Sequence, residues 1–398
     1  MPKASIAMAT TSDLSALNGP SLHFINLTNE LSRLGHPISV LMPQPEAEPP
    51  IPFDREVRQI IGRVNVRRLG LPGTLSVAGM IPALGCIEVD ALYLRASPAS
   101  YFLTVAAKRR PSRVVIVEYN GWLTEEASAL GYPAWACRLT CSLQLSEARR
   151  ADRIRVVTSE LKSILTSCGI PGEKITVVDN GTNTSMFRPL DKCACRRRLG
   201  IPGEVQGPVL TFVGNLWPAI DMATLFQALV LLRVRGRAAR LLVVGNGPER
   251  QKLAEKAAAL LPADVVRFLG GQAPETAAIA IGAADLGVAP FRRARNERVG
   301  LSPLKIRDYA AAGRPVVASE LAGIKELASQ PWLFLAEAEN PDALATAINH
   351  CLDSNPAMLG KQARDYALAN FSWAKVARSV SSLVCAAVSS RRATMSSN

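Results

Sequence analysis

Short apolar runs alternate with amphipathic stretches along most of this chain. Residues 4–9 (ASIAMA) are apolar enough for a buried strand, and residues 19–35 follow with apolar side chains at helical spacing up to Gly35. Residues 37–43 (PISVLMP) form the next apolar run. Strands that alternate with helices are typical of parallel sheets covered by helices. The beginning of the chain is therefore predicted to be an α/β domain.

The same pattern continues on both sides of a change in composition. Short β-branched runs predict further strands at residues 64–70, 91–96, 114–120, 154–159 and 175–181. Residues 184–207 are rich in proline, glycine and arginine, and a second α/β series begins at residues 208–215 (PVLTFVGN). A chain of 398 residues is also too long for one ordinary core. We expect Rossmann-like doubly wound domains over residues 1–190 and 191–375, followed by a helix and a frayed tail over 376–398.

Residues 302–318 (SPLKIRDYAAAGRPVVA) predict a helix with clear start and stop signals. Ser302 is a favourable N-cap and Pro303 a favourable first helical residue. Gly313 is the expected left-handed residue after the helix, and Pro315 prevents its continuation. A polar, glycine-containing loop that leads into a helix N-terminus is a favourable anion site. This stretch is therefore the leading candidate for a ligand-binding segment.

Two charged residues of this helix add chemistry to the anion site. Lys305 supplies a full positive charge near the helix N-terminus. Asp308 carries a carboxylate that can accept two hydrogen bonds from vicinal hydroxyls, as on a ribose. The alternative interpretation is an exposed ion pair between the two residues, with only a small effect on stability.

Polar residues and glycines also follow other predicted strands. Because ligands of open parallel sheets bind beyond the carboxyl ends of the strands, we expect a site in the cleft between the two domains. The candidates are Gly19, Asn120, the pair Gly214-Asn215, and Gly245. Glycines let the backbone approach a ligand closely, and an asparagine can hydrogen-bond a sugar hydroxyl. For each position, an ordinary turn is the alternative.

The charge of the chain favours an anionic partner. Its 46 Lys and Arg exceed its 33 Asp and Glu, which gives a net charge of +13. Basic residues cluster at 108–113, 149–155, 196–198, 233–240 and 292–298. A phosphorylated substrate or an acidic membrane face would suit this charge, and a solvated surface is the alternative. Only 5% of residues are aromatic and none lie among the basic runs, so specific nucleic-acid binding is not expected.

The supply of histidine and cysteine limits the chemistry. The three histidines, His23, His36 and His350, allow no Ser-His-Asp set and no metal cluster. The eight cysteines lack zinc-site spacing and are expected to be reduced thiols. No apolar run reaches the length of a membrane helix, and the N-terminus has no signal-peptide pattern. We expect a cytoplasmic protein without a bound metal.

Taken in order, these strand ends resemble those of the group-1 family of retaining glycosyltransferases (family 4), which have the GT-B fold of two Rossmann-like domains facing across a cleft. Residues 177–189 (VVDNGTNTSMFRP) are similar to the family's V-x-N-G-V-D-x-x-x-F-x-P. Residues 244–253 (VGNGPERQKL) resemble its G-x-G-P-x-x-x-x-L. Residues 302–318 resemble its SPLK-x-x-E-Y-x-A-x-G-x-P-V-V-A variant. The resemblance runs over nearly the whole chain.

The resemblance implies transfer of a sugar from a nucleotide diphosphate donor, UDP- or GDP-type, with retention and without a metal or cofactor. It implies that Asp308 holds the ribose, that Lys305 and the N–H groups near Ser302 hold the diphosphate, and that Gly19 lies against the phosphates. Asn120 falls where many members carry a histidine that faces the sugar. The implied catalytic residues are Asn120, Lys305 and Asp308. The implied donor-binding residues are Gly19, Gly214, Asn215, Gly245, Gly270, Ser302, Leu304, Lys305 and Asp308.

The sequence also departs from the family pattern. The first glutamate of the family's E-x7-E falls on Gly300, and two basic positions after the first strand of the second domain fall on Asn215 and Ile220. A catalytically inactive relative that binds a nucleotide sugar or a protein is therefore the alternative function. The acceptor is not readable, although a lipid-linked molecule or a polysaccharide would fit the family. A basic helix around Arg149–Arg155 is expected to touch the inner face of an anionic membrane.

Overall fold

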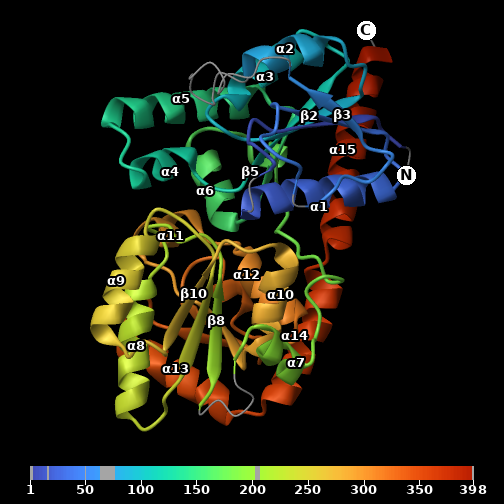
Figure 1. Cartoon of the computed structure of the whole chain (residues 1–398). Coiled ribbons are helices and arrows are strands. Elements are labelled where there is room, and N and C mark those ends of the chain that lie inside the picture. Colours follow the sequence, from blue (N-terminus) through green and yellow to red (C-terminus); the bar gives the residue numbers. More distant parts are fainter. Residues whose placement is uncertain (1–2, 16–17, 50, 63–76, 202–206, 397–398) are drawn as a thin grey trace. The chain divides into compact units, whose positions relative to one another are not determined.

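The computed structural model describes residues 3–15, 18–49, 51–62, 77–201 and 207–396. These residues form two α/β units (Figure 1). The first comprises Met1–Asp179 together with Trp373–Asn398, and the second comprises Asn180–Ser372. This division differs from the expected boundaries at residues 190 and 375, because the last helix belongs to the first unit.

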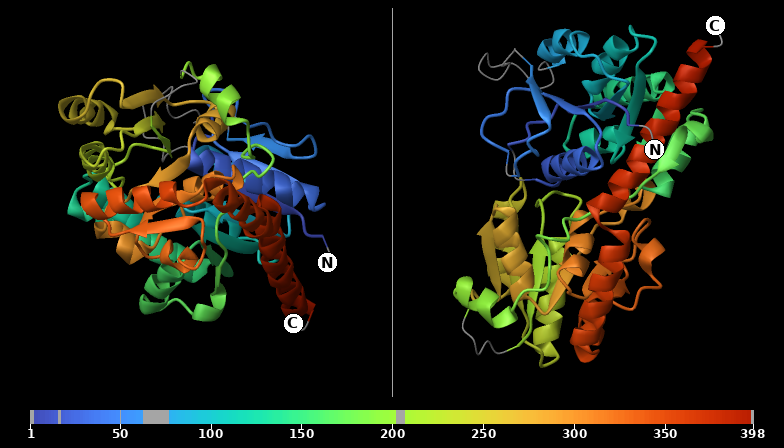
Figure 2. Two further views of the ribbon diagram at one scale, coloured as in Figure 1. Left: turned by 90° about the horizontal axis from the view of Figure 1, so that it is seen from below. Right: turned by 90° about the vertical axis from the view of Figure 1, so that its right-hand side faces the viewer.

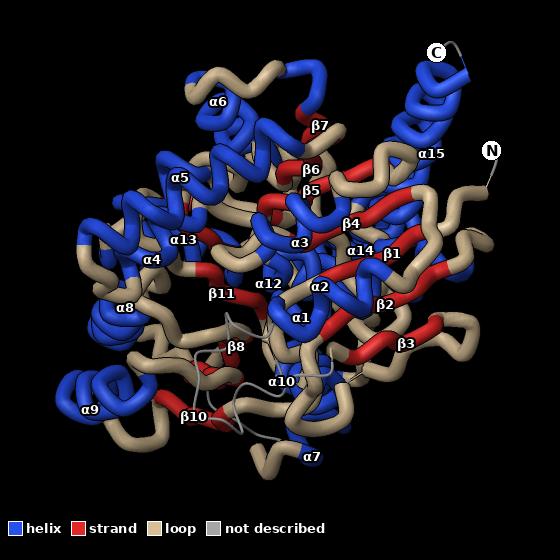
Figure 3. Tube along the Cα trace, turned by 90° about the horizontal axis from the view of Figure 1, so that it is seen from above, coloured by secondary structure: helices blue, strands red, loops and turns tan. Residues whose placement is uncertain are grey.

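The first unit is built on a seven-stranded parallel sheet in the order β3-β2-β1-β4-β5-β6-β7, visible as neighbouring strands in Figure 3. Its strands are β1 (Ile6–Ala9), β2 (Ile38–Met42), β3 (Arg58–Ile61), β4 (Ala91–Arg95), β5 (Val114–Tyr119), β6 (Arg153–Val156) and β7 (Ile175–Val177). Its α-helices are α1 (Gly19–Arg33), α2 (Val77–Gly85), α3 (Ser100–Ala107), α4 (Leu123–Ala129), α5 (Ala134–Arg150), α6 (Ser159–Ser167) and α15 (Trp373–Ser396). The central strands are buried along their whole length because helices cover both faces.

The second unit has a six-stranded parallel sheet in the order β10-β9-β8-β11-β12-β13. Its strands are β8 (Val209–Val213), β9 (Arg240–Val244), β10 (Val266–Gly270), β11 (Leu286–Ala289), β12 (Val316–Ser319) and β13 (Leu333–Ala336). Its α-helices are α7 (Lys192–Arg198), α8 (Met222–Val234), α9 (Arg250–Leu260), α10 (Pro274–Ala283), α11 (Ala294–Val299), α12 (Leu304–Ala311), α13 (Pro341–Asp353) and α14 (Pro356–Asn370). The strand order reverses between β8 and β11, as it does between β1 and β4 in the first unit, and ligands bind at such switch points.

The C-terminal helix α15 packs on α1 and β5 of the first unit (Figure 2). Its buried residues include Trp373, Val380 and Val384, which follow one face of the helix. His36, beyond the end of α1, has its Nε2 2.7 Å from the Oγ of Ser381. The polypeptide therefore leaves the first unit after Asp179 and returns to complete its core at Trp373.

The structure corrects two sequence-based predictions and confirms another. Helix α5 ends at Arg150, and Arg155 is fully buried in β6, so the basic run 149–155 is not one helix. Helix α12 begins at Leu304 rather than Pro303, and Pro303 occupies the N-cap position without a side-chain hydrogen bond. Its end is as predicted: Gly313 has a left-handed φ of 67° and its N–H donates to the carbonyl of Ala310.

Three further predictions concern a strand, membrane helices and metal sites. The strand predicted at residues 64–70 lies outside the described residues. Within the described part of the chain, no helix is both long and apolar enough to cross a bilayer. Over the same residues, no group of three or more His, Cys, Asp or Glu side chains could hold a metal ion.

Candidate functional site

Lys305, in the first turn of α12, has its ammonium group buried against aromatic rings. Its Nζ lies 3.9 Å from the centroid of the Phe212 ring and 5.0 Å from that of Phe291, and the residue is only 9% exposed. No hydrogen bond or ion pair joins this nitrogen to another residue in the described part of the chain. Burial lowers the pKa of Lys305 to about 7, and the charge of Asp308 partly opposes this shift. Among the described residues of the second unit, Lys305 is thus a buried basic group that forms no ion pair with a carboxylate.

The side chain of Lys305 reaches the loop that follows β8. A Cβ placed on Gly214 would lie 3.1 Å from both Cε and Nζ of Lys305. Gly214 is the first residue after β8, so the ammonium group lies at the carboxyl end of a strand next to the switch point of the sheet. That is the position at which a doubly wound sheet binds ligands.

The loops after β8, β9 and β10 are tied to one another through their backbones. The N–H of Gly214 donates to the carbonyl of Val244 at 2.9 Å, and the N–H of Gly245 donates to the carbonyl of Gly270 at 2.7 Å. Gly245 has a φ of 141°, and a Cβ there would lie 1.9 Å from the Gly214 carbonyl oxygen. Backbone packing therefore already requires glycine at position 245, whether or not a phosphate touches it.

Asp308 lies on the same helix but faces a different neighbour. Its Oδ1 accepts a hydrogen bond of 2.6 Å from the hydroxyl of Thr182, whose N–H donates to the carbonyl of Phe371. Burial raises the pKa of Asp308 to about 7, against the opposing effects of the Thr182 hydrogen bond and of the charges on Arg307 and Lys305. The interpretation of Lys305 and Asp308 as an exposed ion pair is wrong, because Lys305 is buried and the described residues include no ion pair between them.

The remaining candidates of the second unit lie near the start of α12 and at the ends of strands. The carbonyl of Ser302 accepts a hydrogen bond of 3.1 Å from the side-chain amide of Asn180, and Leu304 is the first residue of the helix. Asn215 is half-buried in the loop after Gly214, and Gly270 ends β10. These residues stay candidates for donor contact.

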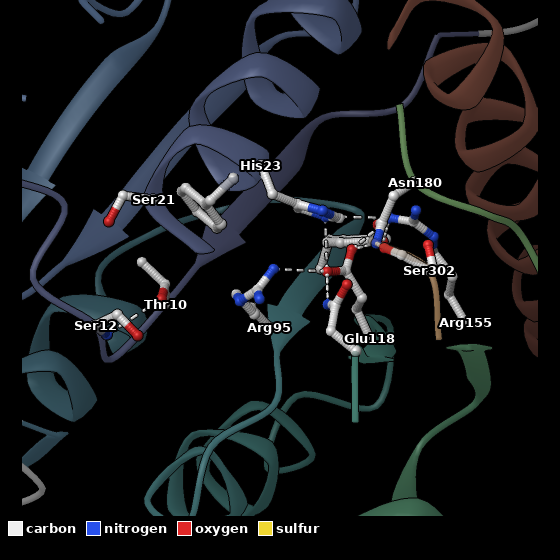
Figure 4. Close-up of polar contacts among 12 residues, drawn as sticks. Thr10, Ser12, Ser21, His23, Arg95, Glu118, Arg155, Asn180 and Ser302 are labelled. Atoms are coloured by element: carbon white, nitrogen blue, oxygen red, sulfur yellow. Dashed lines mark hydrogen bonds and ion pairs between the residues drawn. The ribbon is translucent and has the colours of Figure 1, made fainter. Parts of the chain in front are cut away.

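In the first unit, a buried carboxylate lies at the carboxyl end of β5. Glu118 is 1% exposed, and its Oε1 lies 2.8 Å from His23 Nε2 and 3.2 Å from an Arg95 nitrogen (Figure 4). Its Oε2 lies 2.6 Å from an Arg155 nitrogen and accepts a hydrogen bond from the hydroxyl of Tyr93. Burial alone would raise the pKa of Glu118, but the His23 and arginine partners hold it well below its usual value.

Arg155 and His23, which both contact Glu118, also contact the segments where the chain leaves the first unit, after Asp179, and returns to it, at Trp373. Arg155 Nε donates to the carbonyl of Val178, and its second terminal nitrogen donates to the carbonyl of Asp179, each at 3.0 Å. The His23 ring meets the Trp373 ring edge-on with centroids 4.8 Å apart. Burial lowers the pKa of His23 to about 4, so the imidazole is neutral near pH 7.

Asn120 and Gly19 are also placed by the first unit. The side-chain amide of Asn120, just past β5, donates a hydrogen bond to Glu118 Oε1. Gly19 is the first residue of α1, and the preceding Asn18 caps the helix by accepting from the N–H of Ser21 at 2.9 Å. Both candidates therefore lie in connections that follow the carboxyl ends of β5 and β1, where ligands of doubly wound sheets bind.

Sequence reasoning missed Glu118 and its cation partners. Arg155 falls both in the basic run 149–155 and in the strand predicted over residues 154–159. The strand prediction was the available signal, because the strands of a parallel sheet that is covered on both faces are buried. A charged residue within an apolar strand, such as Glu118 after Val114–Val117, is a further signal of a buried ion pair.

Comparisons with known proteins agree with this architecture. A family model described as "Glycosyltransferase Family 4" matches residues 17–186, and one described as "Glycosyl transferases group 1" matches residues 207–354. Together the two models span most of the chain. The chain belongs to the group-1, family 4 glycosyltransferases. The family resemblance seen in the sequence is thereby confirmed.

Curated relatives are identical to this chain at about a third of the aligned positions. It is 31% identical over 258 residues to the D-inositol 3-phosphate glycosyltransferase of Thermobispora bispora, a match that covers 56% of this chain and 58% of the relative. It is 31% identical over 287 residues to D-inositol 3-phosphate glycosyltransferase 2 of Catenulispora acidiphila, a match that covers 69% of this chain and 65% of the relative. The matches thus span less than two thirds of these relatives' own length.

Solved structures confirm the expected GT-B fold for this chain. The sucrose-phosphate synthase of Thermosynechococcus elongatus superposes with a TM-score of 0.74 and 18% identity over 96% of this chain and 98% of that one. HepE of Anabaena, in complex with UDP and glucose, superposes with a TM-score of 0.71 and 17% identity over 96% of this chain and 100% of HepE. At such low identity these likenesses concern the fold and not the substrate.

The structure shows what surrounds the positions at which the sequence departs from the family pattern. Gly300 supplies no carboxylate, and the nearby Glu297 is engaged elsewhere: its Oε2 accepts from the N–H of Ala322, and its Oε1 lies 3.6 Å from Lys325 Nζ. Ile220 is paired through its backbone with Phe291. Lys305 is a basic residue whose side chain reaches the loop that contains Asn215, since its Nζ lies beside Gly214.

Proposed function

We propose that this protein transfers a sugar from a nucleotide diphosphate donor to an acceptor, with retention of anomeric configuration and without a metal ion. The observation that carries the proposal is the buried ammonium group of Lys305 at the carboxyl end of β8. A buried cation is costly unless an anion accompanies it, so this position favours a ligand that brings negative charge. A UDP- or GDP-linked sugar brings two phosphates.

Lys305 would stabilise the diphosphate both when bound and when it leaves. The negative charge on the leaving nucleotide grows as the sugar–oxygen bond breaks, and a preorganised cation in a site of low polarity interacts strongly with that charge. The backbone N–H groups at the start of α12 add the positive end of a helix dipole. This arrangement assigns to the chain's own groups the role that a metal ion has in other transferases.

Asp308 would hold the ribose of the donor. Its Oδ1 is engaged by Thr182, and its second carboxyl oxygen can accept a hydrogen bond from a ribose hydroxyl. Because the pKa of Asp308 is raised to about 7, the carboxylate and the protonated acid are both populated near neutral pH. The Thr182 hydrogen bond orients the group in both forms.

Incubation of the protein with a panel of sugar nucleotides tests this proposal. UDP-glucose, UDP-N-acetylglucosamine, GDP-mannose and ADP-glucose would each be monitored for slow hydrolysis, and then for transfer to inositol 3-phosphate, an acceptor chosen from the names of the relatives. We expect at least one donor to be hydrolysed with retention, and addition of EDTA to leave the rate unchanged. Binding of a nucleotide without any turnover would instead favour the inactive relative, and no binding of any nucleotide would overturn both the transferase function and a nucleotide-sugar-binding role.

We also propose that α5 brings the first unit to an anionic membrane surface. Tyr132, Trp135 and Leu139 expose 58%, 64% and 52% of their surface, and the exposed Arg138 lies among them. Exposed aromatic side chains beside arginine suit the boundary between lipid headgroups and acyl chains, and anionic lipid complements the charge. The protein would then act peripherally on the inner face of a membrane, near a lipid-linked acceptor.

Sedimentation with vesicles tests the membrane proposal. We expect binding to vesicles that contain phosphatidylglycerol, weaker binding to neutral vesicles, and loss of binding when Trp135 and Leu139 are both changed to serine. Val234→Ser is the matched control, because Val234 is an apolar residue of the second unit with 79% exposure. Equal sedimentation with neutral and anionic vesicles, or no effect of the double substitution, would remove this proposal.

A further inference from the structure

A cavity of about 580 Å³ lies on the second unit, at the edge of its sheet opposite to the Lys305 ammonium group. Its lining includes Asp285, just before β11, and Pro315, just before β12, so it lies at the amino ends of these strands. The ammonium group of Lys305 lies at the carboxyl end of β8, which is parallel to them. The volume falls within the range of roughly 300–1,000 Å³ that is typical of small-molecule sites.

The lining of this cavity carries an excess of positive charge. Four of its residues are basic (Lys192, Arg314, Lys361 and Arg364) and one, Asp285, is acidic. Asp285 is already engaged, since its Oδ1 lies 2.7 Å from Lys192 Nζ and its Oδ2 lies 2.9 Å from an Arg196 nitrogen. No ion pair joins Arg314, Lys361 or Arg364 to a carboxylate in the described part of the chain. Three cations of the lining therefore remain for a ligand.

Arg314 is held by one side of its guanidinium group. Its Nε donates to the carbonyl of Ile281 at 3.2 Å, and its Nη2 donates to that of Gly282 at 2.6 Å, in the last turn of α10. Its Nη1 forms no hydrogen bond with any described residue. Burial lowers the pKa of Arg314, and the charge of Asp285 opposes this shift. The group has thus lost hydration and still has N–H donors to offer.

Arg364, on α14, is held in a similar way. Its Nη1 donates to the carbonyl of Ala311, the last residue of α12, at 2.7 Å and to that of Phe187 at 2.9 Å. Over the described residues, its Nε and Nη2 form no hydrogen bond. Capping of helix ends accounts for the engaged nitrogens of both arginines but not for those that remain.

Two glycines determine how closely α14 approaches the end of α12. A Cβ on Gly360 would lie 2.4 Å from the Gly313 carbonyl oxygen, and Gly313 has a left-handed φ of 67°. Both glycines line the cavity. Closely packed backbone therefore shapes this part of the cavity, and the two arginines are fixed before a ligand arrives, which lowers the entropy lost on binding.

We propose that this cavity binds the phosphate group of a small phosphorylated molecule between Arg314 and Arg364, with Lys361 adding charge. The guanidinium group matches the geometry of phosphate oxygens, and a phosphate brings about two negative charges to meet the excess of cations. Pro189, Pro315 and Pro356 offer apolar surface to the rest of the molecule. This second anion site is separate from the proposed donor site, and it does not depend on the proposed function.

Calorimetry with inorganic phosphate, at constant low ionic strength, tests the inference. The Lys305→Met protein is used, so that phosphate bound near β8 does not contribute. We expect phosphate to bind at one site and acetate, with a single charge, to bind about tenfold more weakly. No binding of phosphate would overturn the inference, and equal affinities for phosphate and acetate would overturn the assignment to phosphate.

Charge reversal at Lys361 locates the bound phosphate. Lys361 is exposed and forms no hydrogen bond or ion pair in the described part of the chain, so Lys361→Glu should fold, whereas variants of the two arginines also lose helix caps. In the Lys305→Met background, Lys361→Glu should lower the phosphate affinity about tenfold. Lys256→Glu, at an exposed position on α9, is the matched control and should leave it unchanged. Equal affinities in these two variants would overturn the inference.

A separate measurement keeps this inference apart from the proposed function. With Lys305 retained, Lys361→Glu should leave the affinity for a sugar nucleotide unchanged, because the donor site lies at the other edge of the sheet. Loss of phosphate binding alone therefore concerns this cavity, and loss of sugar-nucleotide binding alone concerns the donor site. A parallel loss of both in Lys361→Glu would contradict the existence of two sites.

Discussion

The ammonium nitrogen of Lys305 lies 3.9 Å from the centroid of the Phe212 ring, in the strand that leads into Gly214. The face of an aromatic ring attracts a cation, but it does not replace the water that a buried ammonium group loses. The aromatic ring thus holds the Lys305 side chain in place but makes up only part of the hydration that its ammonium group loses on burial. The consequences of this state can be measured in binding and in stability.

Donor binding should depend on pH through Lys305. Its pKa in the free protein is lowered to about 7, and a bound diphosphate would raise it, so binding above pH 7 takes up a proton. We expect the affinity for UDP-glucose, or for whichever sugar nucleotide binds, to fall from pH 7 to pH 9 by up to about tenfold per unit. Calorimetry across this range measures the slope.

Asp308 titrates in the same range, so its contribution must be separated. Asp308→Asn removes the carboxylate but keeps an oxygen that can accept from Thr182. The slope should persist in Asp308→Asn and vanish in Lys305→Met. A slope that survives Lys305→Met would assign the titration to another group.

Lys305→Met should weaken donor binding while it stabilises the protein. Loss of a charged contact to phosphate should lower the affinity about 10- to 100-fold. At neutral pH, however, methionine removes the cost of burying a cation without a partner, so the free energy of unfolding should rise by about 1 kcal/mol. Chemical denaturation and calorimetry on the same variant measure the two effects. Lys252→Met is the control, because that side chain is 78% exposed on α9, and it should change neither quantity.

Thr182→Val tests the hydrogen bond that orients Asp308. The substitution preserves the shape of the side chain but removes the donor to Asp308 Oδ1, and should cost about 1 kcal/mol of stability. Because that hydrogen bond lowers the pKa of Asp308, its loss should shift the pKa further upward. Weaker binding of UDP in the variant would be the functional counterpart. Unchanged unfolding and unchanged UDP affinity would show that the contact matters to neither.

Gly245→Ala should destabilise the second unit strongly. The new Cβ would lie 1.9 Å from the Gly214 carbonyl oxygen, at a φ that L-residues rarely adopt. The loops after β8 and β9 would have to separate, and we expect a cost of at least about 3 kcal/mol. Gly271→Ala is the control, because its Cβ would meet only the Asn246 Cβ, at 3.8 Å, and should change stability by less than about 0.5 kcal/mol. Thermal unfolding of both variants makes the comparison.

Arg155→Met should destabilise the first unit by about 3–5 kcal/mol, since it breaks a fully buried ion pair with Glu118 and removes donors to two backbone carbonyls. Arg153→Met, two residues earlier in β6, is the matched control. The Arg153 side chain is half-buried and donates to the neighbouring carbonyl of Asp152, so a cost below about 1 kcal/mol is expected. Similar costs for both variants would contradict the role assigned to the buried cluster.

The sequence predicted the architecture well because alternation of apolar runs and helical spacing is a local signal. The signal for the end of α12 was also local, because a glycine in the left-handed conformation with a proline shortly after it ends a helix. Its start was one residue off, because Pro303 takes the N-cap position and the Ser302 carbonyl is engaged by Asn180.

Long-range packing was not predictable in the same way. The burial of Lys305 depends on Phe212 and Phe291, which come from two other segments of the chain. The Glu118 cluster draws on α1, β4, β5 and β6, and no single window of sequence contains it. A lone sequence also gives no sign that the last helix returns to the first unit.

That return has a consequence for how the protein is made. On the ribosome, the second unit is complete as one continuous segment once Ser372 has emerged, whereas the strands of the first unit, synthesised earlier, still lack the helix that covers α1 and β5. The unit that is synthesised first therefore keeps apolar surface uncovered until α15 has been synthesised. A truncation that removes α15 would expose the core of that first unit, although α15 lies far from it in the sequence.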